Sequence, residues 1–517
     1  MNMHDVRREK GQSIPDRFSK FCLLIVLLLA ACYLSGCGRG GPIAGKEPIK
    51  NVFKVENNIG VLRAWTENKA RAAVLIHIDP ADDMAIFSSM LADDMKNATV
   101  YLKRRNMSVF DKLAPLVERG GVVNLGYMAG MYKRVIWVVP SRRPVSETPP
   151  TIYRNFFLDQ RKFPKTGVGE FKMEGNHIIG SIAGIPLTIT RLSELSIGED
   201  ENAIVDIDLA YFPYKRREDT SYLVGTRTLL SFLRELADRN VRTRLVTVDY
   251  SIQSGLVPMD LRFFGDVISE ALAKPNMLSG EVPEKWQMMI QAEDSMRTGQ
   301  YLAAEALYST ILDKGPVDAG TYFSLAVARG FQDKGKECRS ALLDAYALDS
   351  EYLRGFTQLA RVLGGVGKVS AGIEILDTPE LTKILAPIEV HYQKGVFYYS
   401  AHRPFDAITY LQNAATQRPN DFGLYSILFK AYRDAGDSEG QLASLRKLVD
   451  IDDGRVRREM SWVYADLGQL YERADSSASA VRMYEKYVQA NPGDSLSIVL
   501  SKKIKALSAK GSGMSKR

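Results

Sequence analysis

Cysteine is scarce in this chain, and its placement excludes an internal disulfide over most of the length. The 517 residues include four cysteines, of which Cys22, Cys32 and Cys37 lie close to the N-terminus. Cys338 is the single cysteine after residue 37, so this later part of the chain offers it no partner. It occupies a small-residue position in a predicted helix, which favours buried packing for this thiol.

A large excess of charge of one sign is also missing. The chain has 68 basic and 61 acidic residues, a formal net charge of +7 that is modest for this length. Proteins that bind nucleic acids carry a clustered basic face, so we expect no nucleic-acid partner. The sequence contains neither a Gly-rich phosphate-binding loop nor a serine nucleophile elbow.

The chain begins with a basic segment, a short apolar run and small residues. Five basic residues between positions 7 and 20 precede the apolar run Phe21 to Leu34. A membrane-spanning helix needs about 20 apolar residues, so this run is too short to span comfortably. The order of basic, apolar and small residues is typical of a secretory signal.

The end of this segment, Leu34-Ser35-Gly36-Cys37, resembles a bacterial lipobox, in which the cysteine is lipidated and becomes the mature N-terminus. The resemblance implies a signal peptide at 1–36, lipidation of Cys37 and a Gly/Pro-rich tether at 37–49. Gly38 resembles the pattern that lets lipoproteins reach the outer membrane, so we expect a lipid-anchored envelope protein that faces the periplasm. An uncleaved anchor and a plain signal peptide are the alternatives.

Residues 50–274 alternate predicted strands with predicted helices, which indicates a mainly parallel sheet covered on both faces. Two predicted strands end in acids that share one face, because side chains alternate along a strand. Acids that converge at strand ends need a positive partner, usually a metal ion or an arginine. The candidate metal ligands are His77, Asp79, Asp83, Asp206 and Asp208.

These motifs carry a family resemblance that covers most of residues 50–275. The segment from His77 to Asp83 resembles the D-x-H-x-D signature of the arginase/deacetylase superfamily, and Asp206-Ile207-Asp208 resembles its D-x-D signature. The closest form is the D-I-D-L-D-Y-F motif of a bacterial branch. The resemblance implies a three-layer α/β fold and a divalent-metal hydrolase of C–N bonds in guanidino or amide substrates.

Three departures from the family pattern argue against an active enzyme. Ala81 stands where the family has its central histidine, Asn57 or Asn58 lies where another histidine is expected, and Ala210 replaces the third acid. The remaining set is mostly oxygen, which binds Mg²⁺ or Ca²⁺ weakly and activates water poorly. We therefore expect a degenerate site with no catalytic residue and no resident cofactor beyond a weakly bound divalent metal. A working C–N hydrolase is the alternative.

The C-terminal half is helical and repetitive. Pro316 and Ser350 are 34 residues apart, as are Pro419 and Asp453, and small and aromatic residues recur inside the units. This pattern resembles tetratricopeptide (TPR) repeats. The resemblance implies an all-α solenoid of about six repeats with a polar capping helix over 284–508, after a linker at 275–283 and before a disordered tail at 509–517.

In TPR proteins the first helices of successive pairs line the binding groove. The residues predicted to lie on that face are aromatic or basic: Tyr392, Tyr399, Lys430, Arg433, Trp462 and Arg473. This mixture suits an extended peptide of acidic character. The sequence thus predicts two partners, a membrane through the N-terminal lipid and another envelope protein or extended peptide through the repeats.

Overall fold

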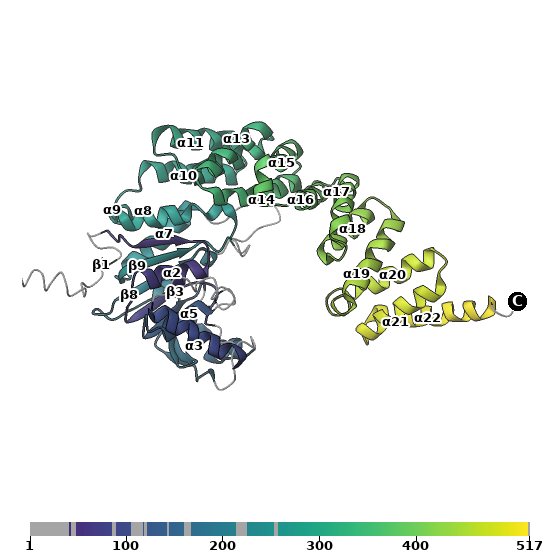
Figure 1. Ribbon diagram of the computed structural model, residues 1–517, viewed down its shortest axis with the longest axis horizontal. Helices are drawn as coiled ribbons and strands as arrows, with labels where there is room; N and C mark the ends of the chain where they lie inside the picture. The colour runs from purple at the N-terminus through teal and green to yellow at the C-terminus, as the bar shows by residue number, and fades with distance from the viewer. Residues whose placement is uncertain are drawn as a thin grey trace, which may run out of the picture. The chain divides into compact units, whose positions relative to one another are not determined.

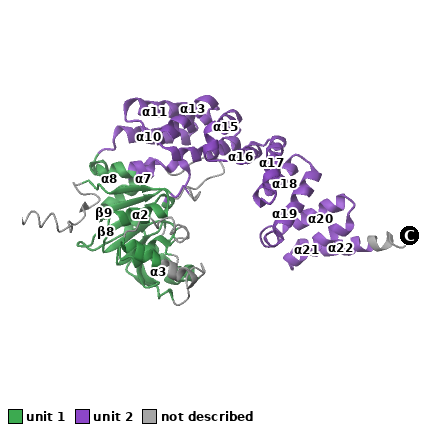
Figure 2. Cartoon of the chain, viewed as in Figure 1, with its two compact units in different colours: residues 1–211, 231–250, 268–280 green, residues 212–230, 251–267, 281–517 purple. Residues whose placement is uncertain are grey.

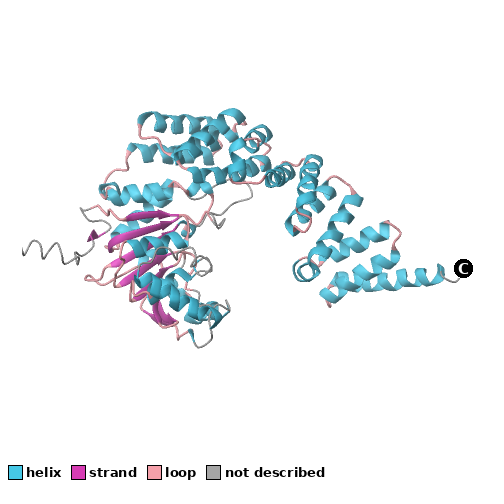
Figure 3. Cartoon of the chain, viewed as in Figure 1, coloured by secondary structure: helices cyan, strands magenta, loops and turns pink. Residues whose placement is uncertain are grey.

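The computed structural model describes residues 41–42, 48–84, 89–104, 117, 121–141, 144–159, 167–212, 225–252 and 257–514. The predicted signal peptide and Cys37 lie outside these residues. The chain divides into two compact units (Figure 2). Unit 1 comprises Met1–Tyr211, Ser231–Tyr250 and Ile268–Gly280, and unit 2 comprises Phe212–Leu230, Ser251–Val267 and Glu281–Arg517. Figure 3 shows that the strands belong to unit 1, whereas unit 2 is helical.

Unit 1 is built on a nine-stranded mixed sheet with the order β1-β9-β8-β3-β4-β7-β6-β5, in which β2 also pairs with β9. The strands are β1 (Gly41–Pro42), β2 (Val52–Val55), β3 (Val74–Ile78), β4 (Arg134–Val138), β5 (Lys172–Glu174), β6 (His177–Ile182), β7 (Ile185–Thr190), β8 (Ala203–Asp208) and β9 (Arg242–Asp249). The pairs from β2 through β9, β8, β3 and β4 to β7 are parallel. Strands β5 and β6 continue the sheet in antiparallel fashion. The predicted mainly parallel sheet is confirmed.

The central strands are buried on both faces, as expected for apolar runs in a parallel sheet. Every residue of β3 and of β8 is buried. Leu75, Ile204 and Leu245 lie on one face and belong to a core that also contains Trp65 of α2 (Asn58–Glu67) and Leu125 of α5 (Val122–Met128). The side chains of the opposite face are equally buried: Val74, Ile76, Val205 and Val246.

Five further helices accompany the sheet in sequence: α3 (Ser89–Arg104), α6 (Pro150–Asp159), α7 (Thr226–Asp238), α8 (Phe264–Ala273) and α9 (Asn276–Ser279). Helix α9 lies in the predicted linker 275–283, and its Met277 and Leu278 are buried. Among the described residues, no helix combines the length and the apolar character that crossing a membrane requires.

Unit 2 is a series of helix pairs followed by one long helix (Figure 1). The pairs are α10 (Glu284–Arg297) with α11 (Tyr301–Lys314), α12 (Ala319–Phe331) with α13 (Gly335–Leu348), α14 (Arg354–Gly365) with α15 (Val369–Leu376), α16 (Pro387–Ser400) with α17 (Pro404–Gln417), α18 (Phe422–Asp434) with α19 (Ser438–Glu459), and α20 (Trp462–Arg473) with α21 (Ser477–Ala490). The final helix is α22 (Ser495–Met514). The first helices begin at steps of 35, 35, 33, 35 and 40 residues, and the long last step contains a kink at Asp452 within α19. The predicted region of about six helical repeats is confirmed.

Small residues let the two helices of a pair approach closely. A Cβ atom on Gly395 would lie 2.5 Å from Leu411, and one on Gly468 would lie 2.3 Å from the ring of Tyr484. Cys338 is buried in α13 in the same way, and burial raises the pKa of its thiol to about 12. The recurring small and aromatic residues of the sequence are therefore packing positions.

Candidate functional site

The acidic strand ends meet where the direction of the sheet order reverses. Strand β3 pairs with β4 on one side and with β8 on the other, while the chain runs from β3 to β4 and reaches β8 only later. Ligands of open α/β sheets bind at such a switch point, outside the carboxyl ends of the strands. His77 lies opposite Asp206 in the β3–β8 register, and Asp206 lies opposite Thr247 in the β8–β9 register.

His77 is the centre of this cluster and is fully buried. Its Nδ1 lies 3.1 Å from Asp206 Oδ2, and because a carboxylate oxygen only accepts, Nδ1 is the donor. The hydroxyl of Thr247 donates to the other oxygen of Asp206. Trp65 Nε1 in turn donates to Thr247 Oγ1 at 3.3 Å. The imidazole orientation is thus fixed by a chain of contacts that reaches back to α2.

The other imidazole nitrogen faces two more acids. His77 Nε2 lies 3.5 Å from Asp79 Oδ2, and it has no hydrogen-bond partner. Donor atoms of His77, Asp79 and Asp83 lie within 4.8 Å of one another. Asp83 has a backbone φ of 46°, a left-handed conformation that is uncommon outside glycine, and its side chain accepts a hydrogen bond from Asn58 Nδ2 at 2.9 Å.

Burial and mutual charge perturb these groups in the same direction. Burial alone disfavours the imidazolium, but the hydrogen bond and the charge of Asp206 outweigh it and raise the pKa of His77. Burial and the charges of Asp208 and Asp83 raise the pKa of Asp79 well above its usual range, against the backbone hydrogen bond from Ala81. Burial also raises the pKa of Asp83, although His77 and Asn58 oppose the shift. Each of these shifts favours the protonated form of its group and so opposes the accumulation of negative charge in the cluster.

Asn57 and Asn58, which the sequence left as alternatives, have different roles in the structure. The side chain of Asn57 caps the start of α2 by accepting from Gly60 N at 3.1 Å. Asn58 instead reaches the acids through Asp83. Ala81 and Ala210 contribute only backbone N–H groups, which donate to Asp79 Oδ1 at 2.7 Å and to Asp208 Oδ1 at 2.6 Å respectively.

Three residues of the cluster were not predicted from the sequence: Thr247, Asp249 and Tyr132. Thr247 and Asp249 alternate with Val246 and Val248 on a buried strand, which is the same pattern that identified Asp206 and Asp208. Burial raises the pKa of Tyr132 well above its usual range, and the charge of Asp206 adds to the effect. Its hydroxyl donates to the carbonyl of Val123. No local pattern pointed to Tyr132.

The donors fit one divalent cation. His77 Nε2, Asp79 and Asp83 are the one group of three such donors in the described part of the chain, and a ligating imidazole whose other nitrogen is held by a carboxylate is a common metal-site arrangement. Asp206, a predicted ligand, is hydrogen-bonded to His77 and Thr247. A bound ion would act as a Lewis acid toward a carbonyl or a water molecule.

The six predicted peptide-binding residues lie on α16, α18 and α20, the first helices of three successive pairs. Three of them are linked by contacts. Tyr399 hydrogen-bonds Asp434, whose carboxylate is 3.4 Å from Arg433 Nε. The Arg433 guanidinium lies 5.7 Å from the ring centre of Phe429, and that ring lies 5.5 Å from Trp462.

The predicted basic character of this face is reduced by neighbouring acids. Asp434 pairs with Arg433, and Asp466 also lies within reach of the charge of Arg433. The Arg418 guanidinium covers the ring of Tyr392 at 4.9 Å, and Arg418 is itself ion-paired with Glu389 at 2.7 Å. Lys430 and Arg473 are exposed. The face is of mixed charge with one exposed indole, since Trp462 is 38% exposed.

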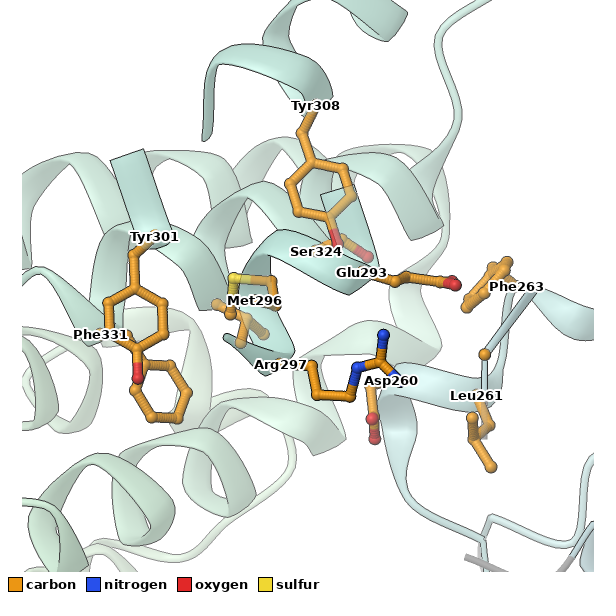
Figure 4. Close-up of a pocket in the computed structure, with 12 residues that line it drawn as sticks. Asp260, Leu261, Phe263, Glu293, Met296, Arg297, Tyr301, Tyr308, Ser324 and Phe331 are labelled. Atoms are coloured by element: carbon orange, nitrogen blue, oxygen red, sulfur yellow. The ribbon is translucent and has the colours of Figure 1, made fainter. Parts of the chain in front are cut away.

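A pocket of about 110 Å³ lies in unit 2 beside the start of α7 (Figure 4). Tyr301 and Phe331 stack on one side of it with ring centres 5.0 Å apart. Glu293 accepts from Thr226 N at 2.9 Å and from its hydroxyl at 2.7 Å, and burial raises the pKa of Glu293 to about 7. The volume of this pocket is well below that of ordinary ligand sites. Through its two hydrogen bonds with Thr226, Glu293 instead holds the first residue of α7 in place.

Comparison with known proteins relates the chain to repeat proteins at low similarity. No model of a known family matches it, and no curated protein matches it either. Among solved structures, the C-terminal part of a TPR repeat-containing protein from Cytophaga hutchinsonii is similar with a TM-score of 0.31 and 13% identity, over 44% of this chain and 90% of that one. PilF of Pseudomonas aeruginosa has a TM-score of 0.24 and 12% identity, over 43% of this chain and 96% of its own. YrrB, described as a TPR protein with an unusual peptide-binding site, has a TM-score of 0.21 and 15% identity, over 42% of this chain and 90% of its own.

Proposed function

We propose that this chain is a lipid-anchored protein of the bacterial cell envelope whose helical repeats bind an extended segment of another protein. One observation carries the proposal, namely that contacts connect the first helices of three successive pairs. They run from Tyr399 on α16 through Arg433 on α18 to Trp462 on α20. The TPR resemblance implies that this helix face is the one that receives a peptide.

The chemistry of this face specifies the kind of peptide. An exposed indole binds an apolar side chain, and the guanidinium of Arg433, which lies over the neighbouring ring of Phe429, binds a carboxylate. Because Asp434 and Asp466 lie next to Arg433, a strongly acidic peptide would be repelled by the neighbouring carboxylates. We therefore expect a segment that alternates apolar residues with single acidic ones, in an extended conformation.

The test uses a library of labelled extended peptides and measures their binding to the full chain by fluorescence anisotropy. The alanine variant Trp462→Ala should weaken binding of the selected peptide at least tenfold, which is the usual effect of removing a buried aromatic anchor. Arg433→Glu should also weaken binding, because it replaces the cation that binds the peptide carboxylate with a second carboxylate. Arg482→Glu is the matched control, since Arg482 is exposed on α21, a second helix. Equal losses in all three variants would contradict the assignment of this face.

For the α/β unit we propose a degenerate relative of the arginase/deacetylase superfamily that has no catalytic role. Ala81 and Ala210 supply no side-chain ligand, Asn58 stands near Asp83 in place of an imidazole, and Asp206 is committed to His77 and Thr247. One imidazole and the carboxylates of Asp79, Asp83 and Asp208 remain, and of these His77, Asp79 and Asp83 lie close enough together to share one ion.

A metal-dependent C–N hydrolase is the second candidate, and one observation favours it. His77 Nε2 is buried without a hydrogen-bond partner and faces Asp79 and Asp83. Orphaned buried nitrogens are uncommon, and a cation is one way to satisfy them. In that case His77, Asp79 and Asp83 would hold the ion, and Asp206 would orient the imidazole. Thermal unfolding of the parent protein and of Asp79→Asn, with and without divalent metal ions, separates the two candidates.

A further inference from the structure

The outer face of the last helix, α22, is not the polar surface that a capping helix usually presents. The inner face contains Leu500 and Leu507, which are buried in the core shared with α20 and α21. The outer face exposes Ile498 and Val499 with exposed fractions of 57% and 58%. The predicted polar capping helix therefore also exposes aliphatic side chains on this face.

Lysines lie on the same face as the exposed aliphatic residues. Helical residues advance by about 100° each, so Lys502 and Lys505 follow Ile498 at the i+4 and i+7 positions of one stripe. Both lysines are exposed. Lys503, one position further round the helix, is instead ion-paired to Glu472 at 2.7 Å. The stripe combines apolar side chains with flexible cationic ones.

The charge of this segment is entirely of one sign. Residues 495–517 contain six of the chain's 68 basic residues and none of its 61 acidic residues. The basic residues are thus less evenly spread than the overall balance suggests. A helix with exposed aliphatic residues, several lysines and no acids has the composition of helices that lie in the plane of an anionic membrane surface.

We propose that the outer face of α22 docks on an anionic phospholipid surface. The aliphatic side chains of Ile498 and Val499 enter the boundary between headgroups and acyl chains, and the lysines contact the phosphates. A second copy of the chain is a poor occupant, because a symmetric contact would bring the exposed lysines Lys502 and Lys505 close to the same lysines of the other copy. The contact is independent of the proposed lipid on Cys37 and would add a second attachment to the membrane.

The test uses residues 38–517, which keep every described residue and lack both the lipidation site and the apolar N-terminal segment. Binding is measured by co-sedimentation with vesicles of phosphatidylcholine alone or mixed with phosphatidylglycerol. We expect binding to the mixed vesicles only, and at least tenfold weaker binding at high salt, because surface charges are screened. Lys502→Glu with Lys505→Glu should abolish binding, and Ile498→Ser with Val499→Ser should weaken it at least tenfold.

The control is a double charge reversal of equal size elsewhere on the repeats, Lys336→Glu with Arg446→Glu, both exposed. It should leave vesicle binding unchanged, and circular dichroism should show the same melting temperature for every variant. Equal sedimentation with neutral and anionic vesicles overturns the proposal. So does a concentration-dependent dimer that Ile498→Ser with Val499→Ser dissociates while vesicles bind nothing, since the face is then an interface between copies.

Discussion

Replacing Asp79 and Asp206 separately with asparagine is expected to move stability in opposite directions. The two acids contact opposite nitrogens of His77, at 3.5 Å and 3.1 Å, and are both buried. Asp206 accepts from His77 and Thr247, so its charge is compensated. Asp79 faces the charges of Asp208 and Asp83. One substitution removes an attraction and the other removes a repulsion.

The sizes follow from the contacts. His77 Nδ1 and the Thr247 hydroxyl both donate to Asp206. Asparagine at this position has only one side-chain oxygen to accept from them, so one charge-assisted hydrogen bond is lost, at a cost of about 2 kcal/mol. For a unit of this size the cost corresponds to a fall in Tm of roughly 4–8 °C. Asparagine at position 79 keeps the oxygen that accepts from Ala81 and presents an N–H group to His77 Nε2. We expect Asp79→Asn to leave Tm unchanged or to raise it.

Thermal unfolding near neutral pH, with a chelator or with Mn²⁺, Zn²⁺, Mg²⁺ or Ca²⁺, measures both effects. A ligand that binds only the folded state raises Tm, and we expect no such rise in the parent protein. The reasoning is refuted if Mn²⁺ or Zn²⁺ raises the parent Tm by several degrees and Asp79→Asn abolishes that rise while lowering stability. The hydrolase would then replace the degenerate domain as the first proposal.

Three other outcomes are expected. At high salt, which weakens the proposed α22 contact, Cys37→Ser should release the protein from the membrane fraction into the soluble fraction, and retention in the membrane fraction through the N-terminal segment would contradict the lipobox prediction. Gly468→Ala should cost roughly 1–3 kcal/mol of unfolding free energy, because its Cβ would lie 2.3 Å from Tyr484. Gly365→Ala, with open space around its Cβ, should instead leave the unfolding free energy unchanged or raise it by up to about 1 kcal/mol in the same denaturant titration. Because its folded pKa is raised to about 7, Glu293 destabilises the fold progressively as pH rises from about 4.5 to about 7. Glu293→Gln should therefore gain on the order of 2 kcal/mol over the parent at neutral pH and nothing at pH 4, while Glu284→Gln, exposed on the same helix, should show no such pH-dependent gain.

The sheet and the repeats were predictable because each rests on a local pattern. Apolar runs bounded by turns identify buried strands, and a step of about 34 residues identifies paired helices. The convergence of the acids followed from one more rule, that parallel strands end at the same edge of a sheet. It required no knowledge of which strands are neighbours.

What the sequence could not supply is register. That His77 lies between Asp79 and Asp206 depends on the pairing of β3 with β8, which no local pattern encodes. The choice between Asn57 and Asn58 depended on where α2 begins, since the first became its cap and the second reached Asp83.

The contacts on the predicted peptide-binding face were also beyond the reach of the sequence. Arg433 and Trp462 were selected from helix periodicity, which places residues on a face but says nothing about neighbours from the next repeat. The structure adds Phe429 between them and acids beside Arg433. An isolated basic residue in the sequence is thus half of a neutral pair in the fold, and the expected peptide changes from acidic to mixed.

For the outer face of α22 the situation is reversed, because the sequence shows the charge correctly but does not show which apolar residues are exposed. Its charge is visible in the sequence, because no acid follows Asp494, yet exposure decides whether the accompanying Ile498 and Val499 are core or surface. Periodicity alone would have placed both in a cap that packs on α21. The burial of Leu500 and Leu507 shows that these two residues form the contact with the repeat core. The aliphatic residues of the outer stripe therefore stay exposed beside the lysines, and the testable hypothesis for this helix is a second membrane contact that does not depend on the lipid proposed on Cys37.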